Sequence, residues 1–446
     1  MLSKCNSTKQ LKKNVSLSIV AQLVSFSVSL LLNLLLPKFV PEKDYSYWQT
    51  FLLYASYVPL LHFGFLDGLM LRYSQYDYDS LDKSLIGSQF KLFLFVEMLF
   101  AGIGMVVSVF IEDEIGRCIW RFISIAIITT NVFTYTSYLF QLTNRIGKYA
   151  MLIIVERALL GIGIVALLLL GVSHFYWICG TYLLATFCAI CWGALQNRGL
   201  YFGGLVRDGI LEFKENVFSG VMLLVANLSS MFLVGGAKMV VQWHYDVLTF
   251  GKVAFSFNIV NLFLTFVTAA SVAIFPSIKR INNDDLPDFY IRIRRSVSPF
   301  LLLTMALYFP GCYLLRLWLP NYAESLGYLG ILMPMVLYAS RVTLLTNNYL
   351  KAYRKEKLML CINVVSVAVA FIVFLISAYL LNSLLLVLTA LVVVVILRSV
   401  VSEIVVMRLI QRCVYASFVW ELLLVAIFVV ISMKFNGFVL IRMILK

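Results

Sequence analysis

Residues 384–407 read LLLVLTALVVVVILRSVVSEIVVM, a mainly apolar stretch long enough for a helix that crosses a lipid bilayer. Such a helix needs about 20 predominantly apolar residues, because the hydrocarbon offers no water to hydrogen-bond an open backbone. Twelve further stretches of similar length and character occur in the chain. The thirteen predicted spans are residues 15–36, 48–69, 88–110, 121–141, 149–171, 174–196, 216–237, 251–275, 296–318, 328–350, 358–381, 384–407 and 414–434.

The composition agrees with a chain that lies almost entirely in a membrane. Of 446 residues, 62% are hydrophobic and 13% are charged, whereas a soluble chain has roughly 45–50% apolar and about 25% charged residues. Exposed apolar surface on that scale would aggregate in water. We therefore expect an all-α integral membrane protein with 12–14 transmembrane helices, the upper limit allowing for the apolar residues before Lys446.

Signals of an enzyme are missing from the sequence. Residues 77–79 read Asp-Tyr-Asp, as in a glycosyltransferase metal motif, but no nucleotide-binding domain accompanies them. H-E-x-x-H and P-loop patterns do not occur, and no loop is long enough for a catalytic domain. We expect no enzymatic activity, no catalytic residues, no cofactor and no metal site.

The basic residues predict the topology. The net charge is +14, yet no nucleic-acid-binding motif occurs, so we expect no nucleic acid partner. With the N-terminus in the cytoplasm, 23 Lys and Arg lie in cytoplasmic segments and eight in outer loops. Because cations resist translocation, this asymmetry predicts a multi-pass protein with a cytoplasmic N-terminus, whose first apolar segment is retained as a span.

The first long loop follows six spans and divides the chain. We predict an N-lobe over residues 1–205, a C-lobe of six spans over 206–408, and one or more extra helices over 409–446. Six spans return the chain to its starting side, as in parallel repeats about an axis normal to the membrane. Lys12-Lys13-Asn14-Val15 opens span one, and Lys214-Glu215-Asn216-Val217 opens span seven in a similar way.

Five charged residues lie deep within predicted spans: Glu97, Glu156, Arg157, Arg341 and Arg398. An ionisable group in hydrocarbon is costly unless it is paired or hydrated, so it marks a functional pathway or a fixed ion pair between helices. Arginine in a hydrated cavity suits phosphate oxygens, which it binds bidentately. The acids are candidates for gating or for coupling to protons or sodium.

Further polar residues lie in spans seven and eight or at their outer ends. Lys238 and Lys252 are candidates for the rim of a substrate cavity, with snorkelling interface lysines as the alternative. Asn227, Asn258 and Asn261 are candidates for its wall, with ordinary hydrogen bonding between helices as the alternative.

The cytoplasmic end of span two contains a candidate gate. Asp67 and Arg72 are placed to meet as an ion pair, which serves equally well as an ordinary interfacial salt bridge. Gly64 and Gly68 have the small-xxx-small spacing that permits close helix contact. His62 is either a proton carrier or a packed histidine.

Four segments resemble bacterial polysaccharide flippases of the Wzx type, which export O-antigen or capsule repeat units. They are residues 44–72, Leu223 to Met231, Phe250-Gly251-Lys252 and Phe275 to Arg280. That family belongs to the multidrug/oligosaccharidyl-lipid/polysaccharide exporter superfamily. The resemblance implies two six-helix lobes around a central cavity lined mainly by spans one, two, seven and eight. Residues 235–238, Gly-Gly-Ala-Lys, depart from the acidic-basic pair that relatives often carry there.

The resemblance also implies a function, a location and partners. The substrate would be an undecaprenyl-pyrophosphate-linked oligosaccharide, moved by alternating access from the inner to the outer leaflet of the bacterial cytoplasmic membrane. Expected partners are this lipid-linked oligosaccharide, membrane lipids, and the polysaccharide polymerase and chain-length machinery.

A multidrug or organic-ion antiporter of the same superfamily is the alternative, although organic cations favour buried carboxylates and Arg and Lys dominate spans seven to twelve. A major-facilitator carrier agrees less well, because its basic motif after span two does not occur. A membrane-embedded polymerase would have a large outer loop.

Overall fold

The computed structural model describes residues 2–204, 206–280, 285–412 and 415–435, and the regular structure of these residues is entirely helical. Nine described helices are long and apolar enough to cross a membrane, and up to twelve spans result if each bent helix pair counts as one. The thirteenth predicted span corresponds to α18 (Tyr415–Phe435), whose apolar part, Val419–Ser432, is shorter. The prediction of an all-helical integral membrane protein is confirmed, and residues 436–446 of the expected extension lie outside the described ranges.

The chain divides into two compact units, Met1–Leu228 and Ser229–Lys446. The division falls inside α9 (Asp208–His244). It lies beyond the lobe boundary predicted at residues 205 and 206, because the first part of α9 packs closely on residues 64–68 of unit 1. The N-lobe, C-lobe and C-terminal boundaries given above remain predictions.

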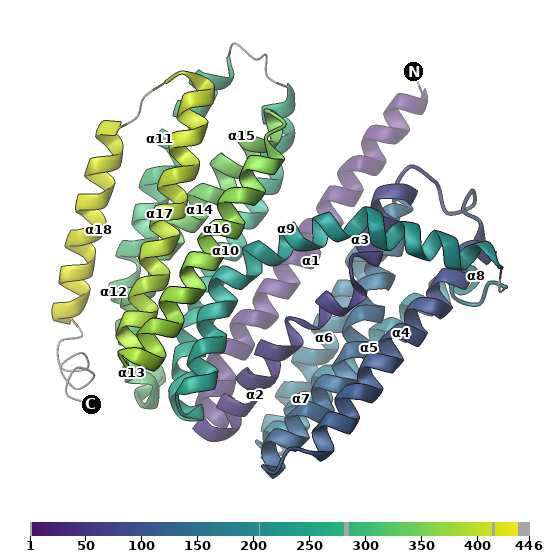
Figure 1. The fold of residues 1–446 in the computed structure, drawn as a ribbon, viewed down its shortest axis with the longest axis horizontal. Helices are drawn as coiled ribbons and strands as arrows, with labels where there is room; N and C mark the ends of the chain where they lie inside the picture. The colour runs from purple at the N-terminus through teal and green to yellow at the C-terminus, as the bar shows by residue number, and fades with distance from the viewer. Residues whose placement is uncertain (1, 205, 281–284, 413–414, 436–446) are drawn as a thin grey trace. The chain divides into compact units, whose positions relative to one another are not determined.

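The remaining helices of unit 1 include five single candidate spans and one broken span, coloured purple to blue in Figure 1. They are α1 (Leu2–Phe39), α2 (Glu42–Ala55), the 3₁₀ helix η1 (Val58–His62), α3 (Phe65–Tyr73), α4 (Lys83–Val109), α5 (Glu114–Leu142), α6 (Ile146–Leu169), α7 (Phe175–Gln196) and the short α8 (Arg198–Tyr201).

Unit 2 continues from the second part of α9, and Figure 1 shows its long helices α16 and α17 side by side. Its elements are α10 (Val247–Arg280), α11 (Leu286–Ala306), α12 (Tyr308–Trp318), η2 (Pro320–Tyr322), α13 (Ala323–Leu332), α14 (Pro334–Arg341), η3 (Val342–Thr346), α15 (Asn347–Ala352), α16 (Glu356–Leu375), η4 (Ile376–Leu380), α17 (Leu384–Ile410) and α18. Of these, η3 and η4 are single π-helical turns within longer helices.

Side-chain oxygens fix where several spans begin. Asp82 accepts hydrogen bonds from the backbone N–H groups of Ser84 and Leu85 at the start of α4. Asp113 accepts one from Gly116 at the start of α5, at 2.6 Å. These contacts satisfy N–H groups that the first turn of a helix leaves without a partner, so the spans begin at defined residues.

Span two is broken in the middle. The segments Glu42–His62 and Phe65–Tyr73 meet at 55°, and the residues between them are left-handed, with φ of 48° at Phe63 and 85° at Gly64. Glycine adopts that conformation without steric penalty. The break changes the direction of the chain, and α3 packs against α9.

An aromatic core holds the helices of unit 1 together around this break. Phe65 of α3 stacks on Phe93 of α4, with ring centroids 5.2 Å apart. Phe93 in turn stacks on Tyr135 of α5 at 5.7 Å, and Tyr201 of α8 meets Tyr135 edge-on at 5.7 Å. Each aromatic pair at such a separation contributes roughly 0.5–1.5 kcal/mol beyond the stabilisation from its buried area. These contacts therefore hold the helices around the break firmly in place.

Candidate functional site

Two arginines and two glutamates form a closed cluster inside unit 2, here called the charge cluster. Its members come from four helices: Arg294 of α11, Arg341 of α14, Glu403 of α17 and Glu421 of α18. Arg294 contacts Glu403 at 2.5 Å and Glu421 at 3.1 Å. Arg341 contacts Glu403 at 3.4 Å and Glu421 at 2.7 Å. All four side chains are buried, and their formal charges cancel.

Hydroxyl groups complete the cluster. Tyr290 donates to Glu403 Oε1 at 3.2 Å, and Ser298 donates to Glu421 Oε1 at 3.2 Å. A buried ion pair is tolerated when each charge is matched and the remaining lone pairs are hydrogen-bonded. Arg341 therefore occupies a neutralised, packed position, as in the alternative of a fixed ion pair between helices.

Two other expected cavity residues also have carboxylate partners. Arg157 contacts its neighbour Glu156 on α6 at 3.0 Å, the carboxylate being buried and the guanidinium about one-third exposed. Lys252 of α10 contacts Glu324 of α13 at 2.9 Å. The fixed-ion-pair alternative thus describes these residues better than an open binding surface does.

Among the expected cavity cations, Lys238 and Arg398 differ from Arg157, Arg341 and Lys252, because no ion pair joins either of them to a described residue. The ammonium of Lys238 lies over the ring of Phe257 of α10, 5.1 Å from its centroid. Arg398 Nε is buried and has no hydrogen-bond partner among the described residues. These two positive charges of unit 2 are therefore available to an anion.

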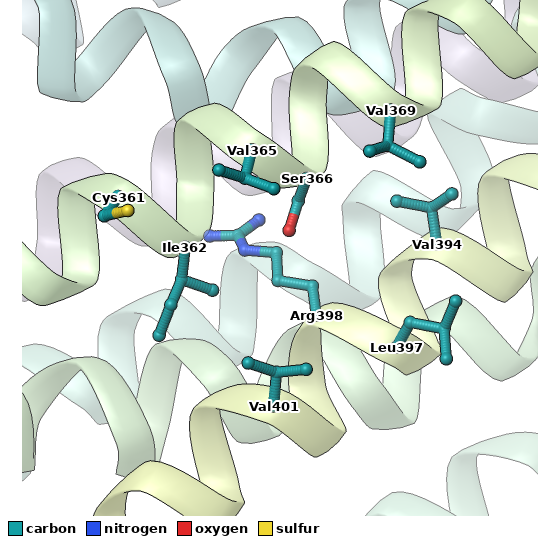
Figure 2. Close-up of a pocket in the computed structure, with 9 residues that line it drawn as sticks. All are labelled: Cys361, Ile362, Val365, Ser366, Val369, Val394, Leu397, Arg398 and Val401. Carbon is teal, nitrogen blue, oxygen red and sulfur yellow. The ribbon is translucent and has the colours of Figure 1, made fainter.

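Arg398 lines two cavities within unit 2. One, of about 310 Å³, lies between α16 and α17 and is drawn in Figure 2. The other, of about 170 Å³, is lined by residues of α9, α10, α14, η3 and α17, among them Val234, Val267, Ala339 and Thr343. Among the described residues, the arginine is the only charged residue on the wall of either cavity.

The expected asparagines occupy less enclosed positions. Asn261 of α10 and Asn227 of α9 are exposed. Asn258, one helical turn before Asn261, is partly buried. None of the three lines either of the two cavities described above.

The candidate gate has a different pairing from the one expected. Arg72 contacts Glu212 of α9 at 2.7 Å and donates to Asn216 Oδ1 at 3.1 Å, and no ion pair joins it to the buried Asp67. Asn216 also donates to Gln89 of α4 at 2.6 Å. The cationic end of span two is therefore tied to α9.

Close packing explains this pairing. An added Cβ on Gly68 would lie 1.8 Å from the carbonyl oxygen of Asn216, and one on Gly64 would lie 2.5 Å from the backbone nitrogen of Val221. The predicted close helix contact at Gly64 and Gly68 is confirmed. His62 is buried, and its Nδ1 accepts a hydrogen bond from the Gly64 N–H at 3.1 Å, so the histidine supports the break in span two.

Glu97, like Asp67, is a carboxylate buried in unit 1 without a basic partner among the described residues. Glu97 of α4 is fully buried, and its Oε2 accepts a hydrogen bond from Asn131 Nδ2 at 2.6 Å. Glu97 Oε1 and Asn131 Oδ1 are buried acceptors that lack a hydrogen-bond partner among the described residues. Such a pair of oxygens suits a bound proton or a small cation. No group of three or more His, Cys, Asp or Glu in the described part of the chain could hold a metal ion.

Three members of the charge cluster were not predicted from the sequence. Glu403 and Glu421 stand inside predicted apolar stretches, so the rule that singled out Glu97 would have found them. Arg294 was assigned to a cytoplasmic loop, whereas α11 already begins at Leu286.

Several solved transporter structures have a similar fold. An inward-facing multidrug resistance transporter of the MATE family, in the MOP superfamily, aligns with a TM-score of 0.63 and 11% identity over 89% of this chain and 97% of that one. The lipid II flippase MurJ in an inward closed conformation aligns with a TM-score of 0.62 and 13% identity over 96% of this chain and 100% of that one.

A MATE structure in complex with MaL6 aligns with a TM-score of 0.59 and 13% identity over 90% of this chain and 96% of that one. No protein-family model and no curated protein sequence matches the chain. The chain therefore shares the fold of MOP superfamily transporters, at sequence identities that leave its substrate open.

Proposed function

We propose that the chain is a transporter that moves an undecaprenyl-pyrophosphate-linked oligosaccharide from the inner to the outer leaflet by alternating access. The fold is shared with a lipid flippase and with multidrug transporters, which supports a transport role. The Wzx-type resemblance of residues 44–72 favours a polysaccharide precursor as the substrate.

The charge balance inside unit 2 is the observation that carries this proposal. The charge cluster is neutral by itself, and Lys238 and Arg398 remain as cations that no described carboxylate neutralises. A cation left in hydrocarbon is unfavourable, and an anionic ligand relieves that cost. Pyrophosphate is such a ligand, since guanidinium binds its oxygens through charge-assisted hydrogen bonds.

The proposal includes the setting of the reaction. The protein would lie in the bacterial cytoplasmic membrane with its N-terminus in the cytoplasm, as the distribution of basic residues favours. It would hand its substrate to a polysaccharide polymerase with its chain-length machinery. Glu97 would couple the cycle to a proton or sodium gradient.

A multidrug or organic-ion antiporter is the second candidate, and an observation in unit 1 favours it. Asp67 and Glu97 are buried there, and neither forms an ion pair with a described base. Buried carboxylates of this kind attract organic cations as well as protons.

Reconstitution distinguishes the two candidates. The purified chain would be placed in vesicles containing a fluorescent polyprenyl-pyrophosphate oligosaccharide, with a membrane-impermeant quencher outside. We expect protein-dependent quenching of label from the inner leaflet and no exchange of a fluorescent organic cation. Exchange of the organic cation against protons or sodium, with no movement of the glycolipid, would replace the proposal with the second candidate.

A further inference from the structure

The cavity between α16 and α17 is a groove on the apolar outside of unit 2. Its walls come from two helices that run side by side: Cys361, Ile362, Val365, Ser366 and Val369 of α16, and Val394, Leu397, Arg398 and Val401 of α17. Five of these residues are exposed: Cys361, Val365, Val369, Leu397 and Val401. Exposed apolar side chains on a membrane-spanning helix face lipid chains, so the groove opens to the hydrocarbon.

Arg398 is the charged residue of this groove, and it lies near the middle of its span. At 1.5 Å per residue it is roughly 21 Å from Leu384 and roughly 18 Å from Ile410, the two ends of α17. Snorkelling brings a guanidinium to the interface only from positions near a helix end. Figure 2 shows the guanidinium instead lying beside Val365 and Ser366 of α16.

The same side chain borders the inner cavity of unit 2. That cavity lies on α9, α10, α14 and α17, and Arg398 lines it together with Val395 of the same helix. A cation thus stands where a lipid-facing groove and an inner cavity share a wall. Arg398 Nε is buried without a hydrogen-bond partner among the described residues. Its N–H can therefore donate to an acceptor that is not part of the protein.

We infer that the α16–α17 groove holds the apolar chain of a polyprenyl pyrophosphate whose phosphate binds Arg398 while the lipid crosses between leaflets. The apolar wall selects a hydrocarbon chain, and the guanidinium selects a phosphate at the end of that chain. The hydrocarbon core is about 30 Å thick, so a resting lipid keeps its phosphate about 15 Å from the midplane. A phosphate at the depth of Arg398 therefore belongs to a lipid in transit.

This inference rests on the proposed function and names the part of the substrate that unit 2 recognises. Two sources share the required chemistry, a polyprenyl pyrophosphate and an ordinary anionic phospholipid. The sugar head of the substrate finds little to bind in this groove, since Ser366 is the only polar uncharged residue among the described residues that line it.

Photolabelling of the full chain in phosphatidylcholine vesicles tests the site directly. The probe is a polyprenyl pyrophosphate with a diazirine on its chain, and labelled peptides are read by mass spectrometry. We expect labelling on α16 and α17. Arg398→Gln removes a charge-assisted hydrogen bond and should weaken labelling about tenfold, and Arg398→Lys should retain part of it.

A matched pair of tryptophan variants separates filling of the groove from general damage. Val401→Trp fills the groove and should weaken labelling at least as much as Arg398→Gln. Val393→Trp places the same side chain at an exposed position of α17 outside the groove and should label like the wild type. Labelling unchanged in both Arg398→Gln and Val401→Trp would overturn the inference.

Competition identifies the source of the phosphate. Displacement by unlabelled polyprenyl pyrophosphate at about tenfold lower concentration than by phosphatidylglycerol supports the glycolipid carrier. Equal displacement would assign the groove to ordinary phospholipid and overturn its assignment to the polyprenyl pyrophosphate. Binding is read separately from flipping. Labelling that depends on Arg398, without flipping, would remove the proposed function and leave the site. Flipping without such labelling would support the proposed function and remove the site.

Discussion

Gly64 and Gly220 meet backbone to backbone, so closely that a Cβ on Gly220 would lie 1.9 Å from the carbonyl oxygen of Gly64. We predict that Gly220→Ala destabilises the protein by roughly 1–3 kcal/mol, because the obstructing atoms are main chain and cannot rotate away. Thermal unfolding in detergent measures this. Gly102→Ala is the control, since nothing lies within 4 Å of its added Cβ, and it should be neutral or gain up to about 1 kcal/mol. Equal unfolding temperatures for both variants would contradict the contact.

The charge cluster should contribute to stability through its completeness. Glu403→Gln removes the carboxylate that faces both Arg294 and Arg341, leaving buried positive charge uncompensated. We expect a loss of roughly 3–5 kcal/mol. Asp288→Asn serves as the control, because its pair with Arg412 is more than half exposed on both sides, and should cost at most about 1 kcal/mol. Unfolding temperatures that fall equally in the two variants would show that the cluster contributes no more to stability than an exposed ion pair does.

The helical class could be predicted from sequence because it depends on composition over windows of about 20 residues. The thirteen predicted spans exceed the nine to twelve candidate spans found among the described residues. The break at Phe63 and Gly64 could not be predicted in the same way, since it depends on a left-handed backbone inside an apolar run. A hydropathy pattern records whether a residue belongs in lipid and carries no information on φ.

The candidate site was predicted only in part, for a reason that Arg72 illustrates. Asp67 is near Arg72 in sequence, yet the ion pair is made with Glu212 of a distant helix. Likewise, Arg341 was correctly placed inside a span, but its neutralisation depends on how α17 and α18 pack beside it. Arg398 shares the same sequence signal and has no such partner among the described residues, so only the structure separates the two arginines.

The topology predicted from the basic residues can be checked in unit 1. Single-cysteine variants are made at Ser80 and His174 in a cysteine-free background. Ser80 lies in a loop predicted to be cytoplasmic, and His174 lies at the predicted external end of span 174–196. In intact cells a membrane-impermeant maleimide should label the His174→Cys variant and label the Ser80→Cys variant only after lysis. Ser80 and His174 are both exposed, so burial would not explain a lack of reaction with the maleimide. The reverse pattern would place the N-terminus outside.

Glu97 gives the sharpest prediction on coupling. Its Oε1 and the Oδ1 of Asn131 are two buried acceptors without a described donor, and a proton or a sodium ion would satisfy them. Glu97→Gln supplies an N–H donor of the same shape, so the free energy of unfolding should stay within about 1 kcal/mol of the wild type.

The functional result should differ from the structural one. In reconstituted vesicles the wild type should flip the glycolipid faster when a proton or sodium gradient is imposed, and Glu97→Gln should respond to neither gradient, because the amide can neither take up a proton nor balance a cation. Ser84→Ala on the same helix is the control, as its backbone N–H rather than its hydroxyl is bound by Asp82. A gradient response of equal size in Glu97→Gln and wild type would assign coupling to another group, whereas loss of folding would mean that the carboxylate is charged and held by a partner.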